Sequence, residues 1–320
     1  MRALLVTWIA AALVTLGLSA QAEGAYPGQN GRIVYVRTPG GLPPDSTRRL
    51  MVLDPTTGIA RNLRGSVSAP AASPAGARIA YVCGSHEIDE PAISHICVVN
   101  TDGTAKRRLT HGSGYDLAPS FSRDGGRIAF VRRIDGRTRV TVMRGDGSRP
   151  RGIPGTTGAE STAFRPVGRG LLFTRDDIVY SIRSDGTALR RITRAGATAP
   201  VDLRAISPDG RRSVFVRWGQ GLFAGTLYTA AIDGTDARPV PGSPSNAGSS
   251  PAFSPDGLSI VFGRRYAAPN GGSYDEARTA IWAIDVDGGN LRLVKRGRAG
   301  YGASQFDWQP LVLGAQASAR

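Results

Sequence analysis

The sequence predicts an all-β protein, a six-bladed β-propeller of four-stranded antiparallel blades. The main observation is a phrase, Pro-x-Phe-Ser-Pro-Asp-Gly, that recurs along the chain and is followed each time by short apolar strands. The Ser position of the phrase falls at residues 73, 122, 165, 207 and 254, so successive copies lie 49, 43, 42 and 47 residues apart. A repeat period in the forties is typical of propeller blades.

Each copy of the phrase predicts two tight turns and four strands. The Ser-Pro-Asp-Gly segment suits a type I turn, in which Pro fixes φ at the second position. The runs that follow, such as 127–132 and 259–262, are apolar without alternation, which is typical of strands buried on both faces. The third strand of a copy ends at an Asp-Gly turn, as at Asp146-Gly147, and a short fourth strand completes the copy.

The two ends of the chain carry complementary fragments of one further copy. Residues 31–63 contain the second, third and fourth strands, whereas Phe306-Asp307-Trp308 matches a first strand with nothing after it. We expect the C-terminal strand to join the N-terminal blade, because this closes the ring and leaves no open sheet edge. The expected blades are 303–310 together with 31–63, then 69–110, 116–153, 160–193, 199–240 and 249–294.

The repeated residues resemble those of a known family. The full phrase stands at 251–257 and 119–125, its second half at 207–210, and degraded copies at 73–76 and 165–168. They are similar to the TolB-like (WD-like) six-bladed propeller family of exported bacterial proteins, over about residues 27 to 311. The resemblance implies that peptide segments of partner proteins bind at the mouth of the central channel. It also leads us to expect that the N-terminal α/β domain of TolB proper is lacking, because only about four residues separate the expected signal cleavage site from the first blade.

The first 22 residues differ from the rest and predict a signal peptide. Arg2 precedes an almost wholly apolar run over residues 3–18, and Ala20-Gln21-Ala22 forms a small-residue cleavage site. The alternative is an uncleaved anchor, for which the run falls short of the roughly 20 residues that span a bilayer. We expect residues 23–320 to form a single exported domain, periplasmic, cell-surface or extracellular, without a transmembrane segment after cleavage.

The chain is strongly basic, with 40 Lys and Arg against 25 Asp and Glu and a formal net charge of +15. All basic residues except Lys106 and Lys295 are Arg, a ratio that fits the codon bias of a GC-rich genome. The Arg residues are scattered over the repeats and are not interleaved with aromatic residues, which argues against nucleic acid as a partner. An anionic polymer or lipid headgroup of the envelope remains an open alternative.

The two cysteines, Cys83 and Cys97, lie in neighbouring strands of one copy. In an oxidising compartment they should form a disulfide, and the alternative is two buried thiols.

The sequence contains no recognisable catalytic or metal motif. His86, His95 and His111 lack metal-ligand spacing, and a Gly-x-Ser-x-Gly nucleophile elbow is absent. The acidic residues of the turns, such as Asp124, recur at one place in the repeat and are therefore interpreted as structural. We expect no metal, no cofactor and no catalytic residue, which favours a protein that is not an enzyme.

Candidate binding residues fall on the face of the propeller that carries the long, irregular loops, because variable loops on a rigid scaffold concentrate binding residues. One such loop contains Tyr266, Tyr274 and Asp275. Asp116, Glu160 and Asp202 stand at the start of the innermost strands in three successive copies, where they would ring the channel mouth and attract a cation or a basic peptide. The alternative is three solvated carboxylates.

The resulting hypothesis is a non-enzymatic protein-binding or scaffolding module of the cell envelope, whose partner is an envelope protein or a peptide segment. The alternative is a polysaccharide-binding or polysaccharide-degrading, lyase-type propeller with its site at the channel mouth.

Overall fold

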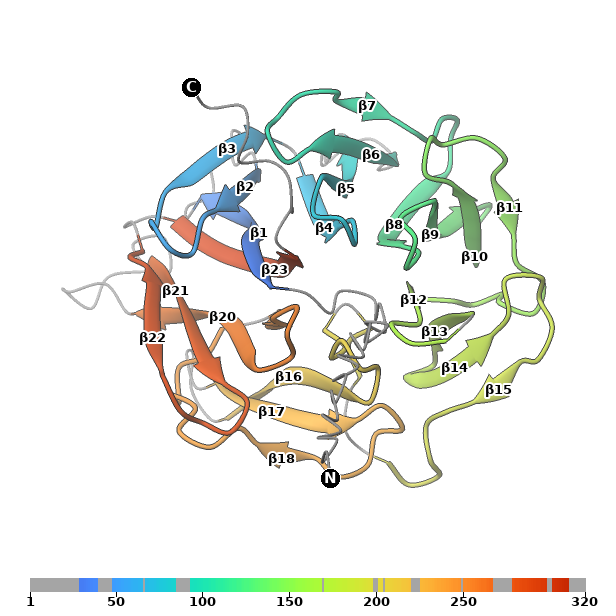
Figure 1. Cartoon of the computed structure of the whole chain (residues 1–320). Helices are drawn as coiled ribbons and strands as arrows, with labels where there is room; N and C mark the ends of the chain where they lie inside the picture. The colour runs from blue at the N-terminus through green and yellow to red at the C-terminus, as the bar shows by residue number, and fades with distance from the viewer. Residues whose placement is uncertain are drawn as a thin grey trace, which may run out of the picture.

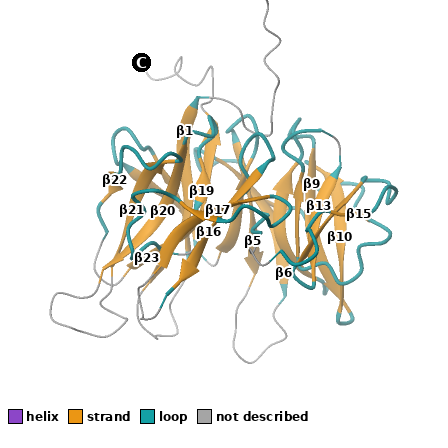
Figure 2. Ribbon diagram, turned by 90° about the horizontal axis from the view of Figure 1, so that it is seen from below, coloured by secondary structure: helices purple, strands orange, loops and turns teal. Residues whose placement is uncertain are grey.

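The computed structural model describes residues 29–39, 48–65, 67–84, 93–168, 170–197, 201–203, 205–219, 225–248, 250–266, 278–297 and 301–310. These residues form an all-β propeller, in which antiparallel sheets stand around a common centre (Figure 1). Seen from the side, the strands run across the thickness of the disc (Figure 2). None of the described segments forms a helix that could cross a membrane. The expected signal peptide, residues 1–22, lies outside the described residues.

The described residues contain 23 strands. In chain order they are β1 (Asn30–Pro39), β2 (Arg49–Leu53), β3 (Ala60–Arg64), β4 (Val67–Ala72), β5 (Arg78–Gly84), β6 (Ser94–Asn100), β7 (Arg107–Arg108), β8 (Tyr115–Phe121), β9 (Arg127–Ile134), β10 (Arg137–Arg144), β11 (Arg151–Gly152), β12 (Ser161–Phe164), β13 (Leu171–Arg175), β14 (Ile178–Ile182), β15 (Arg190–Arg191), β16 (Arg212–Trp218), β17 (Gly225–Ala231), β18 (Arg238–Pro239), β19 (Ala252–Phe253), β20 (Ser259–Tyr266), β21 (Arg278–Asp285), β22 (Arg292–Lys295) and β23 (Tyr301–Pro310).

The described residues form five hydrogen-bonded sheets. The predicted all-β propeller is confirmed, but its division into blades is less regular than expected. Strands β4–β7 and β8–β11 form one eight-stranded sheet, because Ser94 of β6 pairs with Tyr115 of β8. The sheet β16–β18 has three strands, and its inner edge is reduced to an isolated pair between Ile206 and Ser213. The remaining sheets, β23-β1-β2-β3, β12–β15 and β19–β22, have four strands each.

The turns of the repeated phrase are held by their own side chains. In the copy at residue 122, the Ser122 hydroxyl donates to the Asp124 carboxylate and accepts from the Arg127 amide. Gly125 donates its amide to the Ser122 carbonyl and adopts a φ of +66°, which glycine tolerates without strain. Ser207 and Ser254 bond their Asp residues in the same way. The interpretation of the turn carboxylates as structural is therefore confirmed.

Both faces of a sheet pack against neighbouring sheets. In β1, Ile33 and Tyr35 join a cluster with residues of β19–β21, whereas Val34 and Val36 join another cluster with residues of β4–β6. All four side chains are buried. Because successive residues of a strand point to opposite faces, burial of both faces requires a continuous apolar run, which is the pattern that the sequence shows.

The C-terminal strand completes the N-terminal sheet, as expected. Strand β23 pairs antiparallel with β1, with Trp308 opposite Ile33. The Trp308 indole is 4% exposed and donates its Nε1–H to the Gly31 carbonyl at 3.1 Å. The Phe306 ring stacks on Tyr35, with the ring centroids 6.1 Å apart. This pairing joins the two ends of the described chain and closes the ring.

The predicted disulfide is confirmed. Cys83 of β5 and Cys97 of β6 are bonded, with their Cα atoms 5.9 Å apart. The two residues are diagonal neighbours across the antiparallel pair, because Cys83 stands opposite His95 and Cys97 opposite Tyr81. Both pack against the cluster shared with β1 and β2.

We predict that Trp308→Ala lowers the free energy of unfolding by about 3–5 kcal/mol, because a large buried side chain is lost from the closing strand. Denaturant unfolding measures the loss. Trp218→Ala is the matched control: Trp218 is 47% exposed, so its loss should cost about 1 kcal/mol or less. Equal losses in the two variants would contradict the role of β23.

We also predict that replacing Cys83 and Cys97 together by Ser costs about 3 kcal/mol, because the disulfide closes a short loop in the unfolded chain. The same denaturant measurement on oxidised wild type and on the variant gives this difference. A variant as stable as the oxidised wild type would show that the bridge does not constrain the unfolded state.

Candidate functional site

A narrow cavity lies at the centre of the ring, surrounded by the innermost strands (Figure 1). Residues of β4, β8, β12, β19 and β23, and of the segment 202–208, line it, and its volume is about 80 Å³. Most of the lining is apolar, with Pro, Ala and Phe side chains. The cavity is therefore the central channel that the propeller fold predicts.

One position of the repeated phrase, the x of Pro-x-Phe-Ser, supplies much of this lining. Its side chain is small in five copies and acidic in the copy at the C-terminus. The six residues are Ala71, Ser120, Ala163, Ala205, Ala252 and Asp307, and all except Ala205 line the cavity. Small side chains at this position keep the lumen open. Asp307 differs from them in carrying a carboxyl group, so one side of the lumen is acidic at this position.

Asp307 is a carboxylate held among protein groups. Its Oδ2 accepts a hydrogen bond from the amide of Ala72 in the neighbouring strand β4 at 2.6 Å. Burial raises the pKa of Asp307 to about 6, although hydrogen bonds from the amides of Ala72 and Trp308 favour the ionised form. The residue is half-buried and lines the cavity. A proton or a cation can therefore neutralise this group from the channel.

Sequence reasoning missed Asp307, because its copy of the phrase consists of a first strand only. The signal was available: aligning Phe306-Asp307-Trp308 with Pro251-Ala252-Phe253 places an acid where the other copies have Ala or Ser.

Side chains of the innermost strands also tie neighbouring units together. Ser120, at the same repeat position as Asp307, accepts a hydrogen bond from the Phe164 amide at 3.1 Å. Gln305 accepts one from the Ala69 amide through its Oε1 at 2.8 Å. Part of the role of Asp307 is therefore structural, since its bond to Ala72 links two units in the same way.

Asp202 is the predicted site residue that reaches the channel. It is half-buried and lines the cavity with Leu203. Its carbonyl accepts hydrogen bonds from the Ala205 amide at 3.0 Å and from the Ser213 hydroxyl at 3.3 Å, which fix the backbone of this segment. Asp202 and Asp307 are the ionisable residues of the described cavity lining, and no described lining residue is Lys or Arg.

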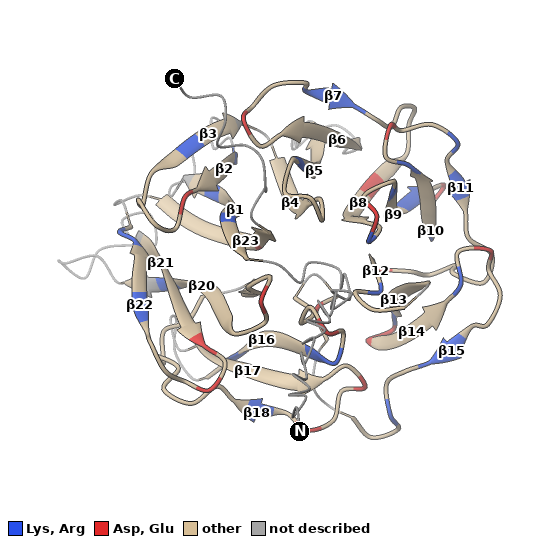
Figure 3. Cartoon of the chain, in the orientation of Figure 1, with Lys and Arg blue, Asp and Glu red and all other residues tan. Residues whose placement is uncertain are grey.

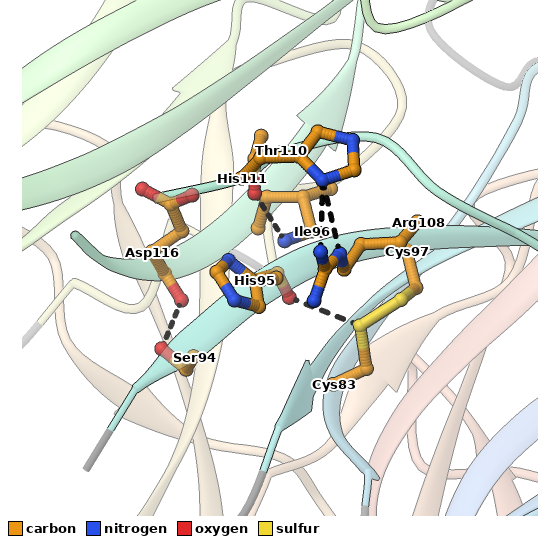
Figure 4. The surroundings of a disulfide bond; sticks show 9 residues. All are labelled: Cys83, Ser94, His95, Ile96, Cys97, Arg108, Thr110, His111 and Asp116. Atoms are coloured by element: carbon orange, nitrogen blue, oxygen red, sulfur yellow. Dashed lines mark hydrogen bonds between the residues drawn. A yellow bond between two sulfur atoms is a disulfide. The ribbon is translucent and has the colours of Figure 1, made fainter. Parts of the chain in front are cut away.

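Asp116 stands at the start of an innermost strand, as expected, but its carboxylate is committed elsewhere. The Arg132 guanidinium donates Nε–H to Oδ1 at 2.7 Å and Nη2–H to Oδ2 at 2.8 Å. The Asp116 side chain is 1% exposed, and Asp116 is not part of the cavity lining. Figure 4 shows Asp116 next to Ser94, whose hydroxyl donates to the Asp116 carbonyl.

Glu160 is exposed, and its Oε1 accepts a hydrogen bond from the Asp176 amide at 3.1 Å. It does not line the cavity either. The three carboxylates that the sequence groups together thus lie in three surroundings, and one of them faces the channel.

Tyr266, the last residue of β20, lines a separate shallow cleft with Trp282 and Arg296. The Arg264 guanidinium lies over both aromatic rings, 5.5 Å from the centroid of Tyr266 and 5.1 Å from that of Trp282. The other two residues of this predicted loop site, Tyr274 and Asp275, lie outside the described residues.

The histidines give no sign of a metal centre. His95 is buried on β6, the strand that carries Cys97 (Figure 4). Burial and the positive charge of Arg108 lower the pKa of the His95 imidazole. His111 pairs its Nδ1 with the Arg108 guanidinium. Across the described ranges, no three His, Cys, Asp or Glu side chains gather closely enough to hold a metal ion. His86 lies outside those ranges.

We predict that the Asp307 carboxyl makes stability depend on pH. Its pKa in the folded protein, about 6, lies above the value of 3.8 for an unperturbed Asp side chain. The folded state therefore binds the proton more tightly, so this contribution is fully present below about pH 4 and is lost as pH rises through about 6. Relative to Asp307→Asn, wild type should lose on the order of 1–2 kcal/mol between these limits, because lumen water screens part of the charge.

Thermal and denaturant unfolding at several pH values measures this difference. Asp287→Asn, at an exposed acid on an outer turn, is the control and should leave the pH profile unchanged. A wild-type profile that parallels that of Asp307→Asn would contradict the raised pKa.

Known proteins resemble this chain in sequence and in fold. The sequence profile of the TolB beta propeller domain matches residues 29–299. A protein TolB homolog from Chlorobium luteolum is 32% identical over 121 residues, which are 36% of this chain and 27% of that protein. The chain thus matches about a quarter of the length of this curated relative.

Two solved structures share the fold. TolB from Acinetobacter baumannii superimposes with a TM-score of 0.66 and 22% identity, over 90% of this chain and 68% of that one. A putative TolB from Agrobacterium tumefaciens superimposes with a TM-score of 0.57 and 18% identity, over 88% and 99%. The profile match extends over most of the chain and over the sheets described above. The chain therefore belongs to the TolB beta propeller domain family.

Proposed function

We propose that this protein is a non-enzymatic binding module of the cell envelope, which holds an extended, cationic peptide segment of a partner protein at the mouth of its central channel, with one Lys or Arg side chain in the lumen. Asp202 and Asp307 are the residues that receive the cationic side chain. We take the propeller as six-bladed, with the eight-stranded sheet counted as two blades and the pair Ile206–Ser213 as the remnant of a first strand. Export, which the signal-like residues 1–22 and the family suggest, would bring the module into the envelope.

The observation that carries the proposal is the contrast in charge between the rim and the lumen. The protein has a formal net charge of +15. Lys and Arg residues lie on the outermost strands β3, β7, β11, β15, β18 and β22 at the rim (Figure 3). The ionisable residues of the described cavity lining are nevertheless the two acids, Asp202 and Asp307. A narrow, mostly apolar lumen with two carboxylates favours a cation, because charges interact more strongly where water is scarce.

The size of the channel favours a slender ligand. Its volume of about 80 Å³ is roughly half of the ~150 Å³ that holds benzene in an engineered apolar cavity. A Lys or Arg side chain, whose stem is apolar and whose head is charged, suits such a lumen. A sugar ring is bulkier than benzene and fits it less well.

The alternative function, polysaccharide binding or lyase-type cleavage at the channel mouth, would use the same pair of carboxylates. The presence of two acids in one cavity lining is the observation that supports it, since carboxyl groups can serve as general acid and base. The width of the lumen argues for the peptide. An assay for polysaccharide cleavage by the purified protein separates the two functions.

We expect short immobilised peptides that retain the protein to contain Lys or Arg. Replacing that residue by norleucine or Gln should weaken binding by about tenfold or more, because a charge-assisted hydrogen bond is lost. Asp202→Asn and Asp307→Asn should each weaken binding of the parent peptide, and much less that of the neutral peptide. Fluorescence anisotropy with the soluble, labelled peptide measures the dissociation constants.

Asp287→Asn serves as the control for a loss of negative charge outside the lumen. Tyr266→Ala tests the contribution of the loop face, as the sequence predicts, and Glu160→Gln tests the carboxylate that lies outside the cavity. Retained peptides without basic residues, or equal binding by Asp202→Asn, Asp307→Asn and wild type, would overturn the proposal. Polysaccharide cleavage that Asp307→Asn abolishes would establish the alternative.

A further inference from the structure

A second cleft lies between the unit β8–β11 and the unit β12–β15, at the end of the propeller that carries the Ser-Pro-Asp-Gly turns. Its volume is about 490 Å³. Three arginines from different segments line it: Arg123 in the turn before β9, Arg127 at the start of β9, and Arg165 directly after β12. One acid, Asp124, also belongs to the lining.

Two other arginines at the repeat position of Arg127, Arg78 and Arg212, are bonded to groups of the protein, whereas Arg32 at the same position is exposed. Arg78, five residues after Ser73, donates to the carbonyls of Gly125 and Gly145 in the next unit at 2.9 and 3.2 Å. Arg212, five residues after Ser207, pairs with Asp236 at 2.7 Å. Arg127, five residues after Ser122, makes one marginal hydrogen bond, from Nη1 to the Ser184 hydroxyl at 3.5 Å.

The difference has a steric cause in the next unit. Arg78 reaches its carbonyl partners beside Gly145, where a Cβ would stand 3.0 Å from the Gly125 oxygen and 3.4 Å from the Arg78 Nη2. In the following unit the corresponding residue is Ser184, one residue before the Asp-Gly turn. By comparison with Gly145, we infer that the Ser184 side chain hinders the approach of the guanidinium to the carbonyls. Arg127 is exposed in the cleft.

The turn that faces Arg127 has also changed its charge. Three copies of the phrase have Ser and Asp at the first and third turn positions, whereas this copy has Arg165 and Val167. Compared with those copies, the turn has a Val in place of the acid and an Arg in place of the Ser, next to Arg127. The side chains of Arg123 and Arg165 make no ion pair with any other described residue.

Asp124 offsets only part of the charge of this cluster, because one carboxylate stands against three arginines. Its Oδ1 is bonded to the Ser122 hydroxyl and to the Gly126 amide, and the hydrogen bond from Ser122 holds its pKa below the usual value. The cleft between β1–β2 and β4–β6 shows that the basic character is local, because its ionisable lining residues are Arg32, Asp54 and Asp102.

The Arg127 guanidinium also contacts an aromatic ring. It lies over the Phe164 ring, 5.4 Å from the centroid. Stacking on an aromatic face leaves the N–H groups at the edge of the guanidinium available for a ligand.

We propose that the cleft formed by Arg123, Arg127 and Arg165 is a binding site for a phosphate group, with the Ser184 hydroxyl as an additional donor. A carboxylate has two oxygens and satisfies one guanidinium fork, whereas a tetrahedral phosphate offers oxygens to several. The cleft is much larger than a phosphate ion, so we infer that it takes a phosphate ester, either a small molecule or one unit of a phosphodiester polymer. This inference is independent of the function proposed for the central channel.

Titration with three probes at constant ionic strength tests the site: inorganic phosphate, glycerol 1-phosphate, and a glycerol phosphodiester oligomer. Binding is followed by calorimetry. We expect saturable binding, and about a tenfold or greater loss in Arg127→Gln and in Arg165→Ser, because each removes a charge-assisted contact. Tighter binding of glycerol 1-phosphate identifies the small ester as the ligand, and tighter binding of the oligomer identifies the polymer.

Arg211→Gln is the matched control, an exposed arginine beside another Ser-Pro-Asp-Gly turn. It should bind each probe with an affinity within about twofold of wild type. This control distinguishes a general effect of net charge from binding at the cleft. Absence of saturable binding by wild type, or an equal loss in Arg211→Gln, would overturn the proposal.

Ser184→Gly provides a test that removes no charge. Without the Ser184 side chain, Arg127 should reach the carbonyls of the next unit as Arg78 does. Affinity for the phosphate probes should then fall, by about threefold or more, while the melting temperature is unchanged or higher. Ser184→Ala removes the hydroxyl but keeps the Cβ, so it should lose less affinity than Ser184→Gly. Equal losses in the two variants, or unchanged affinity in Ser184→Gly, would contradict the explanation of why Arg127 is available.

Discussion

Every sheet of this propeller buries both of its faces, and the rest of the structure depends on that requirement. A sheet with two apolar faces needs a neighbour on each side, so a row of such sheets is complete only when the first and the last meet. Strands β1 and β23 satisfy this condition: Ile33 and Val34, adjacent in sequence, pack into two different clusters on opposite sides of one sheet. The same geometry brings the innermost strands around a common lumen.

The sequence was sufficient for those parts of the fold that depend on local chemistry or on repetition. The Ser-Pro-Asp-Gly turns, the continuous apolar strands, the pairing of Trp308 with Ile33 and the disulfide between Cys83 and Cys97 could all be predicted. The merging of two units through the pair Ser94–Tyr115 could not, because a single backbone contact leaves no trace in the pattern of side chains.

The candidate site was predicted less well, for a physical reason. Repeat position shows where a residue stands along a strand, but it does not show which groups neutralise it. Asp116 stands at the expected place, yet its carboxylate is bound by Arg132, which lies on the neighbouring strand β9. Sequence comparison missed Asp307 because its copy of the phrase is incomplete, although it occupies a repeat position that lines the lumen in nearly every unit. Aligning each position of the repeat separately, and looking for the copy that differs in charge, would have found both Asp307 and Arg165.

Asp307 belongs to the strand that closes the ring, and this makes recognition conditional on assembly. A chain in which β23 has not yet paired with β1 has no carboxylate at that side of the lumen, and the Ala72 amide lacks its acceptor. Under the proposed function, such a chain is unable to hold a partner, so binding is confined to molecules whose folding is finished. A ligand that contacts Asp307 in turn favours the closed ring over the open one, because it binds only the closed form. The partner thus stabilises the β1–β23 pairing of the protein that binds it.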